Sequence, residues 1–164
     1  MSQRVVIDSL VFAREGRSLQ GELPVAGLAR VLDLLTDPAG KISYRLDGQL
    51  GSRNEAQLVL RIDGTLSLRC QRCLEGIDYP VKVCSLLELV KDEEELTQEE
   101  IEDDSRDFLV AQKELDVVEL IEDEIILDLP PAPRHESCAL PGGVLDVEKV
   151  SPFSVLKSLK GKAQ

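Results

Sequence analysis

Apolar and polar residues alternate through the middle of the chain, which predicts β-strands. The alternation is clearest over residues 42–46, 56–68 and 77–83, where every second side chain is apolar or glycine. Because successive side chains of a strand point to opposite faces, each series gives one buried and one solvated face. We therefore predict an antiparallel sheet of three to five strands built from residues 41–90, with one face open to water.

Helical spacing occurs on both sides of this predicted sheet. After Pro24, apolar residues recur every three or four positions over residues 25–35, and they do so again over residues 116–129. Asp116 is a favourable residue before the first turn of a helix, and Pro130 ends the second pattern. The sequence thus predicts two helices that flank the sheet, and an α+β fold.

Charge divides the second half of the chain into segments. Residues 92–128 carry two basic and seventeen acidic groups, and the net charge of the protein is −12. The run at 91–106 has almost no apolar content and cannot offset its ordering entropy by burial, so we predict a mobile acidic loop. Residues 130–164 predict an extended proline-rich segment followed by a short tail helix. We expect residues 1–164 to form a single domain.

Composition restricts the class of protein. Hydrophobic residues make up 43% of the 164 residues, which is enough for a folded core. No apolar run reaches the roughly 18 residues of a membrane span, and Asp8 and Arg14 interrupt any signal-peptide core. Four cysteines, of which two form C-x2-C, are typical of a reducing compartment. We predict a cytoplasmic protein without a membrane partner.

A pair of cysteines lies where two predicted strands meet. Cys70 and Cys73 have the spacing that lets two thiolates reach one tetrahedral zinc ion, and His135 and Cys138 offer two further ligands. Together they predict a structural Cys3His zinc site that would pin the proline-rich segment to the hairpin. One C-x2-C motif is also typical of reduced thiols without a metal, which the sequence favours. Cys84 alternates with valines on its strand and is predicted to lie in the core.

Catalytic patterns are absent from the sequence. A thioredoxin-like pair of thiols sits at a helix N-terminus, whereas this pair sits in a hairpin, which disfavours a redox role. We find no G-x-S-x-G elbow, phosphate loop or H-E-x-x-H helix. The many carboxylates fall in a solvated run rather than in paired acid and base positions. We therefore predict that the protein is not an enzyme and takes no small-molecule substrate.

Basic residues fall in polar positions of the predicted hairpin. Arg61, Arg69, Arg72 and Lys82 would give a small face that contacts RNA phosphates. The alternative, a solvated strand face whose charges prevent aggregation, fits the same residues equally well.

Three motifs, taken in order, resemble those of one protein family. They are Leu-Arg-Cys-Gln-Arg-Cys-Leu-Glu at 68–75, Ile-Glu-Asp-Glu-Ile-Ile-Leu-Asp-Leu-Pro at 121–130, and Ser-Pro-Phe-Ser-Val-Leu-Lys-Ser-Leu-Lys at 151–160. As a set, and with the acidic segment between the first two, they look like the YceD-type family of large ribosomal RNA subunit accumulation proteins. Some members carry a second C-x-x-C pair after the proline-rich stretch, where this chain has His135 and Cys138.

The resemblance implies a non-enzymatic factor for large-subunit rRNA accumulation or processing, with a link to ribosomal protein L32. Such a factor would bind pre-rRNA through the basic hairpin, or a basic ribosomal protein through its acidic segment. The alternative function is a thiol- or zinc-dependent regulatory module unrelated to ribosomes.

Overall fold

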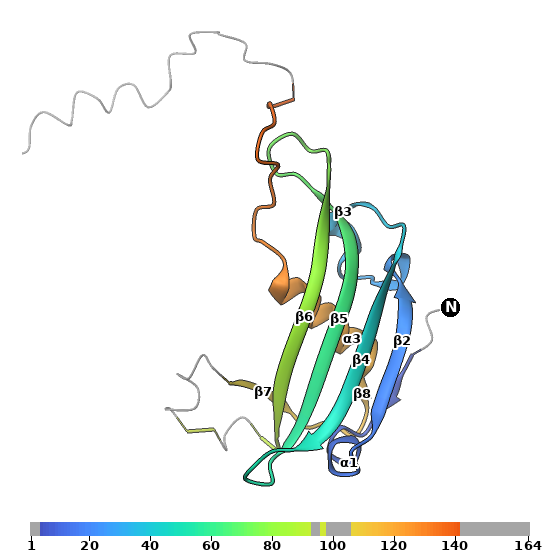
Figure 1. Cartoon of the computed structure of the whole chain (residues 1–164), viewed down its shortest axis with the longest axis vertical. Helices are drawn as coiled ribbons and strands as arrows, with labels where there is room; N and C mark the ends of the chain where they lie inside the picture. The colour runs from blue at the N-terminus through green and yellow to red at the C-terminus, as the bar shows by residue number, and fades with distance from the viewer. Residues whose placement is uncertain (1–3, 93–95, 98–105, 142–164) are drawn as a thin grey trace, which may run out of the picture.

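The structure, a computed structural model, describes residues 4–92, 96–97 and 106–141. The main sheet has the order β2-β4-β5-β6-β7, with β3 pairing with β5. The strands of this sheet are β2 (Ser18–Pro24), β3 (Leu35–Asp37), β4 (Lys41–Leu50), β5 (Ala56–Arg69), β6 (Gly76–Val90) and β7 (Asp107–Val110). The class is α+β, as predicted (Figure 1).

The long hairpin of β5 and β6 forms the centre of the sheet. Its register runs without a break from Gln57 opposite Glu88 to Arg69 opposite Gly76. Neighbouring strands β2, β4, β5 and β6 are antiparallel. β7 instead pairs in parallel with β6, so the sheet is mixed and not purely antiparallel.

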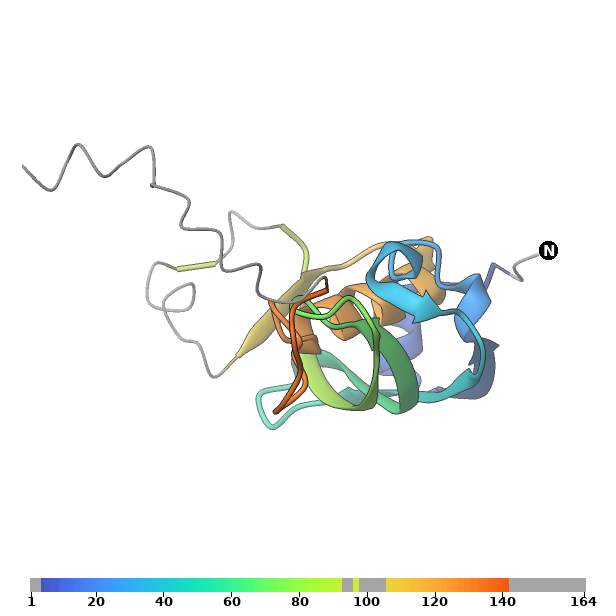
Figure 2. The ribbon, with the colours of Figure 1, turned by 90° about the horizontal axis from the view of Figure 1, so that it is seen from above.

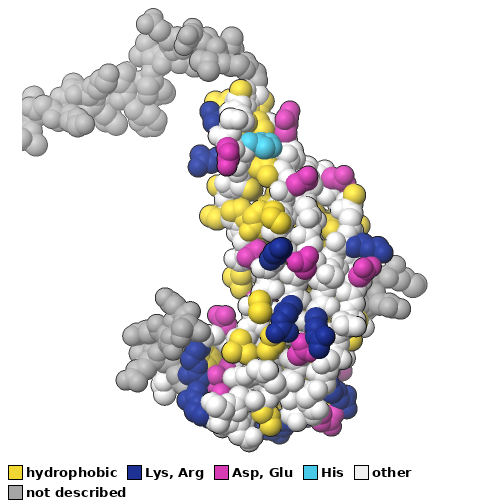
Figure 3. Space-filling model, viewed as in Figure 1, with side chains coloured by type: hydrophobic (Ala, Val, Ile, Leu, Met, Phe, Trp, Pro, Cys, Tyr) yellow, Lys and Arg dark blue, Asp and Glu magenta, His cyan; other side chains and the backbone are white. Residues whose placement is uncertain are grey.

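Within the described part of the chain, helices cover one face of the sheet and leave the other face uncovered. Inward side chains such as Ile42, Leu46, Leu60 and Leu66 are fully buried. They pack with the helices α1 (Ser9–Arg14) and α3 (Val117–Asp128), around which the sheet curves (Figure 2). The outer face is open and carries intermixed basic and acidic side chains (Figure 3).

Helix α3 confirms the predicted second helix. Asp116 caps it, because its carboxylate accepts hydrogen bonds from the backbone N–H groups of Val118 (2.9 Å) and Glu119 (3.4 Å). Asp116 also belongs to β8 (Leu115–Asp116), which pairs with β1 (Val6–Ile7). The strand β1 near the N-terminus is thereby attached to the start of α3.

The predicted helix at 25–35 is wrong. This stretch forms two 3₁₀ turns, Val25–Gly27 and Leu32–Leu34, followed by β3. Most hydrogen bonds within this stretch join residues three apart, as from Leu28 N–H to the Val25 carbonyl and from Val31 N–H to the Leu28 carbonyl. Burial of every third side chain therefore matches a 3₁₀ period of three residues per turn, which the sequence spacing did not distinguish from that of an α-helix.

Replacing Asp116 by alanine is expected to lower the free energy of unfolding by about 1–2 kcal/mol, the range for a lost N-cap. Burial raises the pKa of Asp116, but the hydrogen bonds from Arg4, Val118 and Glu119 outweigh it and lower that pKa. The carboxylate thus stabilises the fold above its unfolded pKa of about 3.9, and this contribution is lost as the pH falls through the lower folded pKa. Urea unfolding at pH 7 and at low pH checks both points. At low pH the gap between the wild type and Asp116→Ala is expected to shrink, and an equal gap at both pH values would contradict the assignment.

Two predictions lie largely outside the described residues. The acidic loop at 91–106 is described only at its ends and at residues 96–97, and the tail helix within 142–164 is not described. Residues 129–141 contain neither helix nor strand. Among the described residues, no helix combines the length and the apolar character that crossing a membrane requires.

Candidate metal centre

The turn between β5 and β6 presents the two cysteines of the C-x2-C motif. The Cys70 N–H donates to the Glu75 carbonyl (2.8 Å), and the Leu74 N–H donates to the Cys70 carbonyl (3.0 Å). Leu74 closes the turn with a positive φ of 68°. In this compact turn, the backbone N–H groups of Arg72 (3.4 Å) and Cys73 (3.5 Å) point at the Cys70 sulfur.

The segment after α3 runs up to this turn (Figure 1). Its backbone is attached there, because the Gln71 N–H donates to the Pro133 carbonyl (2.8 Å). The His135 Nε2 lies 3.1 Å from the Gly76 carbonyl. These two contacts bring His135 and Cys138 next to a hairpin tip that lies about sixty residues earlier in the chain.

Four ligand atoms meet at this point. The Cys70 and Cys138 sulfurs are 3.8 Å apart, the Cys73 sulfur lies 3.3 Å from His135 Nδ1, and all four atoms lie within 4.8 Å of one another. Sulfur ligands of a tetrahedral zinc ion, with Zn–S bonds of about 2.3 Å, are separated by roughly 3.8 Å. The arrangement therefore fits a tetrahedral ion of zinc size, and all four cysteines of the chain are free thiols rather than disulfides.

The surroundings of Cys70 favour a thiolate. Burial, the largest influence, raises the pKa of its fully buried thiol. Hydrogen bonds from the backbone at Cys73, His135 and Arg72, together with the Cys73 side chain, outweigh burial and lower the pKa of Cys70 to about 5. The pKa of Cys138 is raised by burial and by the neighbouring sulfurs of Cys70 and Cys73. The lowered pKa of Cys70 and the raised pKa of Cys138 together indicate that negative charge on Cys70 is felt by its neighbours. A divalent cation bound in the cluster would neutralise this charge.

The histidine is held in the tautomer that a metal needs. With Nε2–H donating to the Gly76 carbonyl, Nδ1 keeps its lone pair, and Nδ1 is the nitrogen that faces Cys73. Orientation of a ligand histidine by a backbone carbonyl is the usual arrangement around zinc. Cys70, Cys73, His135 and Cys138 thus form a group that could hold a metal ion.

Cys84 does not belong to this cluster, and its predicted place in the core is wrong. Its side chain is exposed on the outer face of β6. On this strand the inward face carries Val81, Val83 and Leu87. Cys84 points the opposite way because it is one residue out of phase with them.

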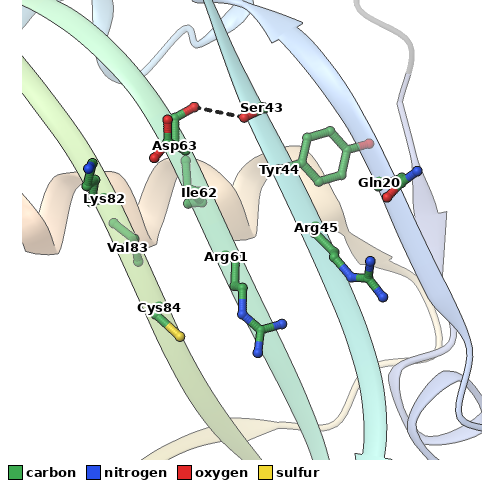
Figure 4. A pocket seen from close by; sticks show the side chains of 10 residues that line it. All are labelled: Gln20, Ser43, Tyr44, Arg45, Arg61, Ile62, Asp63, Lys82, Val83 and Cys84. Carbon is green, nitrogen blue, oxygen red and sulfur yellow. Dashed lines mark hydrogen bonds between the residues drawn. The ribbon is translucent and has the colours of Figure 1, made fainter.

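The four predicted RNA-binding residues fall into two groups. Arg61 and Lys82 lie on the outer face of the sheet and line a shallow open hollow of about 500 Å³ (Figure 4). Arg69 lies at the hairpin tip, eight residues along β5 from Arg61 and six from Asp63, the residue opposite Lys82, and Arg72 follows in the turn. At about 3.3 Å per residue, this separates the groups by roughly 20 Å or more. They therefore do not form one continuous face.

Arg45 joins the group in the hollow and was not among the predicted site residues. It lies directly opposite Arg61 in the register, and both guanidinium groups pair with Asp47, at 2.8 Å and 3.1 Å. Hydrogen bonds from Arg45 and then Ser18 lower the pKa of Asp47. Alternation did place Arg45 on the polar side of its strand, but its neighbour across the sheet depends on a register that sequence alone does not provide.

Comparison with known proteins identifies a family. The model of the family described as large ribosomal RNA subunit accumulation protein YceD matches residues 58–160, which include the β5–β6 hairpin from Leu58 onward, the cysteine cluster and α3. No solved structure matches the chain.

Proposed function

This chain belongs to the family of large ribosomal RNA subunit accumulation proteins YceD, and we propose that it is a non-enzymatic, cytoplasmic factor that supports accumulation of large-subunit rRNA by binding. The observation that carries the proposal is the family match over residues 58–160. The binding partner is a precursor of the large-subunit rRNA or a ribosomal protein of that subunit, L32 being one candidate.

The hollow on the open sheet face supports RNA as a partner. Arg45, Arg61 and Lys82 gather there from three adjacent strands, with Asp63 opposite Lys82 and the neutral Gln20 on a fourth strand (Figure 4). Basic side chains on a rigid sheet suit phosphate contacts, which give affinity and position without reading sequence. Arg69 and Arg72 at the hairpin tip would form a second contact, more than one nucleotide away.

We assign zinc to the cluster of Cys70, Cys73, His135 and Cys138 as a structural ion. Bound zinc would fix the segment that follows α3 against the β5–β6 hairpin, since the two halves of the cluster come from these two parts of the chain. No step of chemistry is required of the ion. Its contribution is to keep the basic hairpin tip and the residues after α3 in one rigid arrangement.

The test is the ratio of large- to small-subunit rRNA in cells that lack the protein, together with a gradient profile of their ribosomes. We expect a depressed ratio that the intact gene restores. An unchanged ratio would overturn the proposal. Complementation with a variant in which Arg61, Arg69 and Arg72 are reversed in charge then separates the two partners: rescue excludes RNA contact through these residues and favours a ribosomal protein.

A second candidate function rests on the cysteine cluster alone. A thiol- or zinc-dependent regulatory module unrelated to ribosomes would need the same four ligands. It predicts a normal rRNA ratio in the deletion strain, together with stoichiometric zinc in the purified protein. A depressed ratio argues against it.

A further inference from the structure

Part of one edge of the central hairpin has no strand partner among the described residues. β7 pairs with β6 only from Leu87 to Val90. Higher up, the segment after α3 lies beside the other end of β6, where His135 contacts Gly76 (Figure 1). Between β7 and the segment after α3, no strand among the described residues pairs with β6 on the side away from β5.

The free edge presents usable backbone groups. Along a strand, the N–H and C=O of one residue point to the same side, and the side alternates with each residue. The Val90 carbonyl accepts from Ala111 N–H (2.8 Å) and the Gly76 carbonyl meets His135, so even-numbered residues of the unbroken strand face away from β5. The N–H and C=O groups of Lys82 and Cys84 therefore point to the open side.

Proline placement agrees with this direction. Pro80 is an even-numbered residue of β6, and a strand tolerates proline where its missing N–H faces away from the neighbouring strand. Pro80 also limits the open interval at its upper end, because it has no N–H to donate. Residues 82–86 remain, which at about 3.3 Å per residue give roughly 17 Å, enough for a short added strand.

The edge borders a groove with apolar and acidic walls. Its volume is about 770 Å³, and β6, β7 and α3 each contribute side chains. Leu127 of α3 lines it and is 78% exposed, which leaves an apolar side chain open at the groove. An added strand at the β6 edge would lie against Leu127 and bury it.

Charge identifies the kind of occupant. Among the described residues, the charged ones that line the groove are Asp107, Asp123, Glu124 and Asp128, with Lys82 as the one basic residue. Asp123 pairs with Arg30, whereas none of the ion pairs among the described residues joins a lysine or arginine to Glu124. Ser85 of β6 donates a hydrogen bond to the Glu124 carboxylate. Burial raises the pKa of Glu124, the Ser85 hydrogen bond lowers it, and the charges of Asp107 and Asp123 raise it further. A polyanion such as RNA would be repelled here.

We propose that this groove binds a lysine- or arginine-rich extended segment of a partner protein, which adds a strand to β6 beside Lys82 and Cys84. Alternate side chains of the segment would contact Leu127, and its basic side chains would meet Glu124 and Asp128. The identification of that partner as a ribosomal protein rests on the proposed function. The docking itself does not.

The experiment uses the full-length protein and a short synthetic peptide that alternates lysine and valine. We expect saturable binding, slower amide hydrogen exchange at Lys82 and Cys84 in the complex, and no binding of a matched peptide with glutamate in place of lysine. Cys84→Pro removes the outward N–H and is expected to weaken binding roughly tenfold, the equivalent of one strong hydrogen bond. Cys84→Ser, which keeps the N–H, is expected to bind like the wild type.

A charge variant keeps the test valid if Cys84→Pro does not fold. Glu124→Gln leaves the backbone unchanged and is expected to weaken the lysine peptide roughly twofold to fivefold. Slow exchange at Lys82 and Cys84 without peptide would overturn the proposal. If this slow exchange depends on protein concentration, a second copy of the protein occupies the edge. If it does not, another part of the same chain occupies it. The proposal would also be overturned if oligouridine, rather than the lysine peptide, bound preferentially and slowed exchange of the Lys82 and Cys84 amides. A normal rRNA ratio in the deletion strain rejects the proposed function and leaves the peptide result intact.

Discussion

Replacing Cys70 by serine is expected to abolish zinc binding, so that zinc in the purified protein falls from about one ion per chain to near zero. Cys70 is the fully buried member of the cluster, and its thiolate is the one that hydrogen bonds stabilise most. The fold then loses the stabilisation that the ion provides. With free zinc at about a hundred times its Kd, that stabilisation is about 2.7 kcal/mol.

Metal analysis and urea unfolding with and without a chelator measure both effects. Limited digestion with trypsin gives a local readout, because Arg134 immediately precedes a ligand. We expect faster cleavage after Arg134 in Cys70→Ser and in chelated wild type. Cys84→Ser is the matched control, since it removes an exposed thiol outside the cluster. Full zinc content in Cys70→Ser, or wild-type protein that takes up no zinc, would contradict the assignment.

Reversing the charge of Arg61 and Lys82 together is expected to lower the affinity for single-stranded RNA at least tenfold at low salt. For every phosphate that the variant no longer binds, the slope of log affinity against log salt concentration should also decrease by roughly 0.7. Both residues line the hollow on the open face, where their exposed positions permit substitution without disturbing the core. Fluorescence anisotropy with oligouridine at several salt concentrations measures affinity and slope.

Arg53→Glu provides the matched control for this prediction. Arg53 lies in the exposed loop that joins β4 to β5, outside the hollow, and its reversal changes the net charge of the protein by the same amount per substitution. A general electrostatic effect would weaken binding in this variant as well. A loss of affinity per reversed charge that is equal in Arg53→Glu and in the Arg61 and Lys82 double variant would argue against a defined RNA site in the hollow.

Sequence patterns predicted the strands of the central hairpin and α3 well, because their periods of two and of about 3.6 residues are distinct. The helix predicted for residues 25–35 was wrong because two periods could not be distinguished there. Apolar positions at 25, 28 and 31 satisfy a period of three as well as the helical one, and Gly27 weakens a longer helix. Only tertiary contacts, such as the Arg30 N–H donating to Glu122 of α3 (3.0 Å), decide between them.

Residues of the metal site were predictable from the sequence where they lie only a few positions apart along the chain. The C-x2-C turn brings Cys70 and Cys73 together locally, whereas the approach of His135 and Cys138 depends on where α3 ends in space. The environment of Cys84 was not predictable, since β6 carries large apolar residues on both faces, Leu86 (48% exposed) on one and Leu87 (buried) on the other. The parallel pairing of β7 with β6 was not predictable from the sequence either, because an alternating pattern does not indicate the relative direction of two strands.

The pairing of β1 with β8 bears on the order in which the protein folds. The hairpins of β4, β5 and β6 close over short loops, whereas Val6 and Ile7 must wait for residues 115–116, and Arg4 for a partner 112 positions later. Closing so long a loop costs entropy before any contact repays it, so we expect such pairing late in folding. During synthesis the first strand would remain unpaired until nearly three quarters of the chain had been made. Pulse-labelled hydrogen exchange should therefore find the Val117 N–H, which donates to the Val5 carbonyl, among the last backbone groups to become protected.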